Sequence, residues 1–93
     1  TIFRTDVAIT VQEVIAVSTG TTPSTTYVLR HHTDRANAGN LLTTSAATTS
    51  TTTGDTATLS VAAIPADSWV WYESTVASGT SVTLSIDVRF TEV

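Results

Sequence analysis

The sequence predicts an all-β fold, an antiparallel β-sandwich of the jelly-roll kind, formed by residues 1–93 as a single domain. Apolar and polar residues alternate in several segments, which is the pattern of strands with one buried face. Threonine makes up roughly a quarter of the chain, beside many valines and isoleucines, and such β-branched residues favour strands. Turn residues separate these segments at intervals of about 8–12 residues, the spacing typical of sandwiches and barrels.

The segment from Thr80 to Glu92 shows the alternation most clearly. Apolar residues occupy one face (Val82, Leu84, Ile86, Val88 and Phe90), and polar residues occupy the other (Thr83, Ser85, Asp87, Arg89 and Thr91). A helix would scatter the same residues around its circumference. The segment is therefore predicted to be a strand with one dry face.

At the start of the chain, apolar residues alternate with polar ones over 4–17, but Glu13 interrupts the alternation. The pattern predicts one long strand with a bulge near Gln12–Glu13, or two strands that share a bend. A helix over 7–16 is disfavoured by its many β-branched residues. Gly20 and Pro23 then mark a turn over 18–24, and 25–32 is predicted to be a strand.

The middle of the chain is more polar. Residues 33–40 contain Asp34, Asn37 and Gly39, which predict a loop. The Ser/Thr/Ala-rich stretch 43–53 fits either an exposed edge strand or a mobile loop, and both alternatives stay open. A strand is expected over 56–63, where Ala57, Leu59, Val61 and Ala63 fall on one face.

The segment 68–74 is apolar on both faces, with Trp69 and Trp71 on one face and Val70 and Tyr72 on the other. Such a strand is usually central in a layered structure or covered by a partner. A turn at 64–67 precedes it. The loop at Ser78–Gly79 is expected to connect it to 80–91 as a β-hairpin, in which Glu73 and Arg89 could form a cross-strand pair.

Composition excludes several classes of function. The net charge is −4, and the four arginines (Arg4, Arg30, Arg35 and Arg89) do not cluster, which argues against a nucleic-acid partner. No apolar run approaches the roughly 20 residues of a membrane span. There is no cysteine, which excludes disulfides, so association is the expected supplement to a small core. An initial threonine is what removal of a start methionine would leave, which suggests synthesis in a cytoplasm.

Residues for catalysis or metal binding are sparse, and no enzyme activity and no cofactor is predicted. His31 and His32 are adjacent, so on a strand they point to opposite faces and cannot both ligate one ion without a bend. Solvated side chains at a strand end are the favoured interpretation, although both histidines could tune an interface near neutral pH. The carboxylates show no paired spacing, and neither a nucleophile elbow nor a phosphate-binding glycine loop occurs.

The aromatic residues Trp69, Trp71 and Tyr72 allow three interpretations. The tryptophans fill the core, which is favoured, or they form a platform on which sugars stack, or one face of the strand meets another subunit. With His31 and His32, these three aromatic residues are the candidate interface positions.

Two stretches resemble a known class of proteins. Arg30 to Gly39 (R-H-H-T-D-R-A-N-A-G) and Ile64 to Thr80 (I-P-A-D-S-W-V-W-Y-E-S-T-V-A-S-G-T), followed by Leu84 to Glu92, are similar to small virion structural proteins of tailed bacteriophages. The resemblance covers about the last two-thirds of the chain and carries no functional residues over. It implies a head decoration (cement) protein or a module of a tail or fibre, commonly a trimer.

The leading hypothesis is therefore a capsid decoration protein. It would form a homo-oligomer, with a trimer expected, bind the major capsid protein on the outer surface of the phage head and stabilise the expanded capsid by mass action. The alternative is a receptor- or glycan-binding module of a tail fibre, which needs Trp69 or Tyr72 exposed. A free-standing adhesion or scaffold domain is the third possibility.

Overall fold

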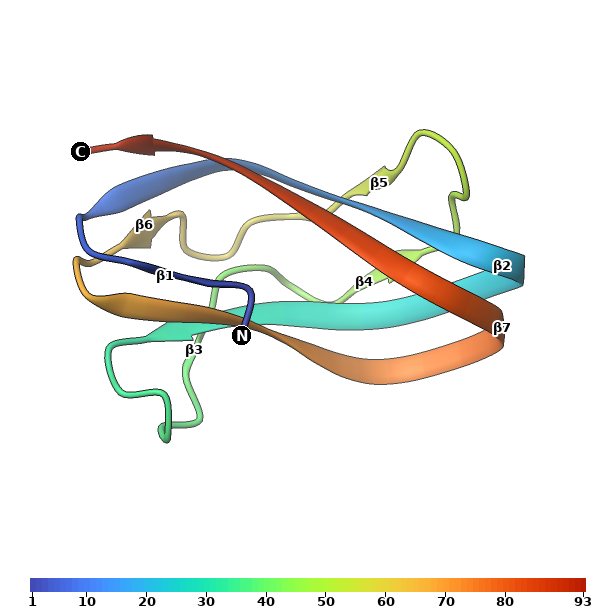
Figure 1. Cartoon of the computed structure of the whole chain (residues 1–93), viewed down its shortest axis with the longest axis horizontal. Coiled ribbons are helices and arrows are strands. Elements are labelled where there is room, and N and C mark those ends of the chain that lie inside the picture. Colours follow the sequence, from blue (N-terminus) through green and yellow to red (C-terminus); the bar gives the residue numbers. More distant parts are fainter.

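Two long strands, β2 (Ile9–His32) and β7 (Ser68–Glu92), dominate the fold and pair with each other in antiparallel fashion along nearly their whole lengths. The computed structural model describes the backbone of residues 1–93 and every side chain except those of residues 46, 75–77 and 81–82. Both strands bend near their middles, so that the two-stranded ribbon doubles back on itself (Figure 1). The first half of β2 thus pairs with the second half of β7, and the remaining halves pair with each other.

Residues with a left-handed backbone lie where the ribbon bends. On β2 they are Gly20 (φ 138°) and Thr22 (φ 44°), and on β7 it is Gly79 (φ 69°). A Cβ atom on Gly79 would lie 2.1 Å from the carbonyl oxygen of Thr22, so this close approach of the two backbones requires glycine. The direction changes expected at 18–24 and 78–79 are confirmed, but each is a bend inside a paired strand rather than a separate turn.

The hairpin expected between 69–74 and 80–91 is wrong. Each of the two segments pairs with β2 and not with the other, as the pairs Tyr72 with Leu29 and Val88 with Val14 show. Glu73 consequently does not meet Arg89. Its carboxylate lies 3.4 Å from the Nε atom of Arg30 instead. The physical reason is that Gly79 bends the chain without closing a tight turn, so each half keeps its distant antiparallel partner.

The bulge expected near Gln12–Glu13 is confirmed, because the register between β2 and β7 shifts between Val11 and Glu13. The apolar face predicted for 80–92, which the even-numbered residues form, is confirmed where the side chains are described. Leu84, Ile86 and Val88 pack partly buried against the core. Phe90 is more exposed, and Val82 lies outside the described side chains.

Four short strands cover the β2 side of the ribbon. They are β3 (Asn40–Leu41), β4 (Ala46–Thr48), β5 (Asp55–Thr56) and β6 (Ala63–Ile64), and all four pair with β2. The first two pair with its second half and the last two with its first half, and a bridge between Thr43 and Leu59 joins them. The strand expected over 56–63 is present only at its two ends. The residues between them make isolated hydrogen bonds to other segments instead of a continuous ladder, as the Ala57 N–H does to the Val14 carbonyl (2.8 Å).

The Ser/Thr-rich stretch 43–53 was left open between an exposed edge strand and a mobile loop. It contains a short strand and a hydrogen-bonded turn, and Thr43 and Thr48 within it are buried. Its strand is β4, and a compact turn follows. The Asp55 carboxylate accepts hydrogen bonds from the amides of Thr49 (2.8 Å) and Ser50 (2.9 Å), and the Ser50 hydroxyl accepts one from the Gly54 amide (2.9 Å). The bonds from Ser50 and then Thr49 hold the pKa of Asp55 below its usual range.

On the β7 side, β1 (Phe3–Thr5) is the single added strand, and it pairs only with Ser68–Val70. The core lies between the two halves of the doubled ribbon and includes Ile9, Val14, Tyr27, Leu29 and Val70 among its fully buried members. Across the described residues the chain is all-β and antiparallel, without a helix, and so without a helix that could cross a membrane. It exposes 5014 Å², close to the roughly 5,200 Å² expected of a compact protein of this mass.

Candidate functional site

Trp71 is buried, with 4% of its surface exposed, yet it lies on the face of β7 opposite the core residue Val70. The loop 33–39 covers it. The Arg35 guanidinium lies 4.1 Å from the centre of a Trp71 ring, and Gly39 sits so close that a Cβ atom there would be 2.5 Å from Trp71 Cζ2. Asn37 holds the loop in place by accepting a hydrogen bond from the Gly39 amide (2.9 Å). Trp71 is therefore closed to a sugar or a partner.

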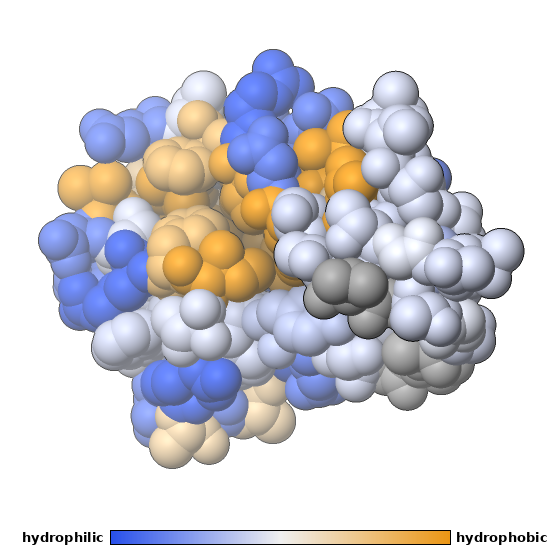
Figure 2. Space-filling view, turned by 45° about the vertical axis from the view of Figure 1, so that its right-hand side comes forward, coloured by the Kyte–Doolittle hydropathy of each residue, from blue (hydrophilic) through white to orange (hydrophobic). Residues whose placement is uncertain are grey.

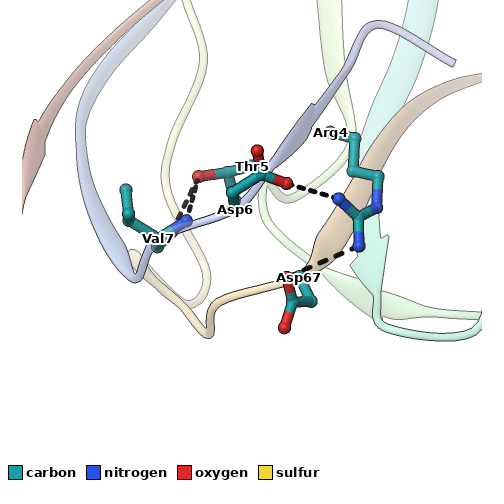
Figure 3. Close-up of polar contacts among 5 residues, drawn as sticks. All are labelled: Arg4, Thr5, Asp6, Val7 and Asp67. Carbon is teal, nitrogen blue, oxygen red and sulfur yellow. Dashed lines mark hydrogen bonds and ion pairs between the residues drawn. The ribbon is translucent and has the colours of Figure 1, made fainter.

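Trp69 is partly exposed, and the Arg4 guanidinium lies 5.6 Å from the centre of its ring. Arg4 is in turn ion-paired with Asp6 and with Asp67 (3.5 Å), as Figure 3 shows. The Thr5 hydroxyl donates to the Val7 carbonyl (2.7 Å), which turns the chain from β1 towards β2. These ion pairs are solvent-exposed, so each is worth less than about 1 kcal/mol.

The two histidines point to different environments, as their adjacency predicted. His31 is 4% exposed, and neither of its ring nitrogens has a hydrogen-bond partner among the described residues. Burial lowers the pKa of His31, and the neighbouring His32 lowers it further. His32 is partly exposed and its Nδ1 accepts a hydrogen bond from the Asp34 amide (2.9 Å). No group of His, Asp and Glu side chains suited to a metal ion occurs in the part of the chain that is described.

Tyr72 faces the core side of the ribbon and remains partly exposed at its margin. Its ring stacks on that of the fully buried Tyr27, with centroids 5.8 Å apart. Of the five candidate interface residues, the structure thus leaves Trp69, Tyr72 and His32 accessible at least in part, and it buries Trp71 and His31. It does not bring Trp69 and Tyr72 to one surface, because they lie on opposite faces of β7.

An open groove lies beside Tyr72, with a volume of about 340 Å³. Ile2, Tyr72, Leu84 and Ile86 line it, so it runs between the two halves of β7 and carries no charged side chain. A second hollow of about 580 Å³ adjoins β1, with Phe3, Val7 and Phe90 among its apolar lining. Phe3 and Phe90 stack with ring centroids 5.9 Å apart.

Figure 2 shows apolar side chains at the left and centre of the view, interspersed with hydrophilic ones, whereas the right-hand end is pale and of intermediate hydropathy. The groove was not predicted from the sequence as a site. The one sequence feature that pointed to the groove was the apolar face formed by the even-numbered residues of 80–92. The sequence did not show that this face would remain partly uncovered.

Comparison with known proteins finds no matching family model, no matching curated protein and no matching solved structure. The similarity to phage virion proteins therefore stays a prediction.

Proposed function

We propose that this chain is a virion structural protein, namely a capsid decoration protein that binds the outer surface of a phage head as a homotrimer and stabilises the expanded capsid. The observation that carries this proposal is the partly open core. Ile2, Tyr72, Leu84 and Ile86 line a groove that remains open among the described side chains. A subunit that completes its core in an assembly gains stability from association, which is how a small cysteine-free domain compensates for a thin core.

The doubled ribbon supports a finer description of the fold. We infer that its two halves act as the two layers of an antiparallel, jelly-roll-like β-sandwich, since they lie over one another with the core between them (Figure 1). A layered β subunit of this kind offers two broad faces and two edges. One edge can serve self-association while another surface contacts the capsid.

The glycan-binding alternative has less support. A sugar platform on this strand would depend on Trp69 without Trp71, because the loop 33–39 covers the Trp71 ring. The Trp69 ring itself lies beneath Arg4.

The decoration role is tested by mixing the purified chain with capsids before and after expansion and sedimenting the particles. Binding to expanded capsids in a fixed ratio to the major capsid protein, with a rise in their thermal disruption temperature, is the expected result. Binding of neither form would contradict the proposed function. Binding instead to purified tails, or to a host glycan array, would favour the fibre alternative.

A further inference from the structure

The hollow beside β1 combines aromatic walls with carboxylates. Phe3 and Val7 line it from the start of the chain, and Phe90 lines it from the end of β7. The two phenylalanine rings stack with centroids 5.9 Å apart, and Phe90 remains 45% exposed, so part of its ring is accessible. The hollow has a volume of about 580 Å³, which is within the size range of ligand sites. It can therefore take a side chain of another molecule.

Glu92 places a charge on the inner face of the last strand. The even-numbered residues 84–88 pack partly buried against the core, and Glu92 continues that face of β7 beyond Phe90. Its carboxylate lines the hollow and, within the described part of the chain, has no ion-pair partner. A carboxylate beside aromatic rings attracts a cation in two ways, through its own charge and through the negative faces of the rings.

Arg4 also lines the hollow, but its charge is already neutralised. Its guanidinium is ion-paired with Asp6, which shares the hollow, and lies 3.5 Å from the carboxylate of Asp67 (Figure 3). Together with Glu92, three carboxylates thus stand against one arginine. The chain as a whole carries a net charge of −4. Both the local and the overall charge favour a positively charged partner.

We propose that this hollow binds a cationic side chain, lysine or arginine, from an extended basic segment of a different protein. The charged group lies beside Glu92 and the accessible ring of Phe90, and the aliphatic stem packs on Val7 and Phe3. A metal ion would gain nothing from the apolar walls, and the described residues contain no group of side chains suited to one. This inference goes beyond the proposed function and does not depend on it, because it concerns the chemistry of the partner.

A second copy of this chain is a poor source of the cation. The sequence contains no lysine, and its only basic residues besides histidine are four arginines. Three of them are engaged within the chain. Arg4 has its two carboxylates, Arg30 lies 3.4 Å from a carboxylate, and Arg35 lies 4.1 Å from the centre of a tryptophan ring. The remaining arginine, Arg89, is exposed, and a contact through it would appear as self-association.

The position of the hollow suits an extended segment. β1 is the outermost strand on its side of the sheet, and no described strand pairs with its outer edge. A peptide that adds beside such an edge gains main-chain hydrogen bonds, while an adjoining pocket selects one of its side chains. The hollow next to β1 is such a pocket, and its charge selects a basic residue.

The test is a chemical-shift titration of the purified chain with the short peptide acetyl-Val-Lys-Val-amide, followed at the backbone amides of Phe90 and Glu92. The comparison probe is the same peptide with Nε-acetyl-lysine, which keeps the stem and lacks the charge. The key variant is Glu92→Gln. Its matched control is Asp87→Asn, which removes the same charge from an exposed residue on the opposite face of β7. A second variant, Phe90→Leu, keeps an apolar wall and removes the ring.

The charged peptide is expected to bind at least about threefold more tightly than its acetylated form, and Glu92→Gln should weaken its binding by about as much. Phe90→Leu should weaken binding as well, whereas Asp87→Asn should leave it nearly unchanged. No binding of the charged peptide, equal binding of the two peptides, or equal loss in Glu92→Gln and Asp87→Asn would overturn the proposal. Self-association that both Glu92→Gln and Arg89→Gln abolish would also overturn it, because a second copy would then supply the cation.

The proposed function is tested separately from this inference. If the charged peptide binds as expected but the chain binds no capsid, the inference stands and the decoration role is contradicted. If the chain binds expanded capsids but not the charged peptide, the decoration role stands and the inference is overturned.

Discussion

Gly79 is the position at which the doubled ribbon is most sensitive to a single methyl group. In Gly79→Ala the new Cβ atom would lie 2.1 Å from the Thr22 carbonyl oxygen and 2.9 Å from its carbon, both of them backbone atoms that cannot rotate away. The left-handed backbone at φ 69° adds about 1–2 kcal/mol for alanine. Relief of the contact requires the two strands to separate, and overpacking of this kind typically costs about 1–3 kcal/mol. Together we expect a loss of about 2–5 kcal/mol, against a total stability of about 5–15 kcal/mol.

The assay is urea unfolding followed by tryptophan fluorescence, with Ser78→Ala as the matched control, since Ser78 is exposed and adjacent. With a slope of about 1 kcal/mol per molar urea for a small domain, the Gly79→Ala midpoint should fall by about 2 M or more. The control midpoint should move by less than about 0.5 M. Equal midpoints for the two variants would show that the strands do not approach each other at this bend.

Three further predictions concern individual side chains. Because the pKa of His31 is lowered by burial and then by His32, the unfolded chain binds a proton at this residue more readily than the folded chain. The stability of the fold should therefore fall as the pH drops below about 6.5. In His31→Leu the midpoint of urea unfolding should depend less on pH, whereas in His32→Leu the pH dependence should remain. Trp71→Ala should cost about 3–5 kcal/mol because its ring is buried under the loop, while Trp69→Ala should cost clearly less; a reversed order in urea unfolding would contradict the placement of the loop. Thr22 holds a β-branched side chain at φ 44°, so Thr22→Asn should raise stability by about 0.5–1 kcal/mol, and a lower melting temperature would count against strain there.

Local features of the fold could be predicted from the sequence because they depend on neighbouring residues. The alternation of Leu84, Ile86 and Val88 correctly gave the buried face of the last strand, and Glu13 correctly marked the bulge. The hairpin between the tryptophan strand and the last strand was wrong. Gly79 indicates that the chain changes direction. It does not indicate whether the chain closes a tight turn or bends within a strand that pairs with a distant segment.

The candidate site shows the same limit. Sequence alternation placed Trp71 on the face opposite Val70, but the cover over its ring is supplied by Arg35 and Gly39 from a loop more than 30 residues away. Nor could alternation show that Tyr72 would lie at an uncovered edge, since this depends on β1 ending its pairing at Val70. Both outcomes depend on which distant segments meet, and periodicity carries no such information.

The proposed place of this chain in a virus particle is tested most directly by counting it. Quantitative mass spectrometry of purified virions would give its copy number relative to the major capsid protein. Hundreds of copies in fixed ratio to the capsid subunit are the result expected of a head decoration protein. A few to a few dozen copies would place the chain in the tail or fibres, and its absence from virions would contradict a structural role in the particle.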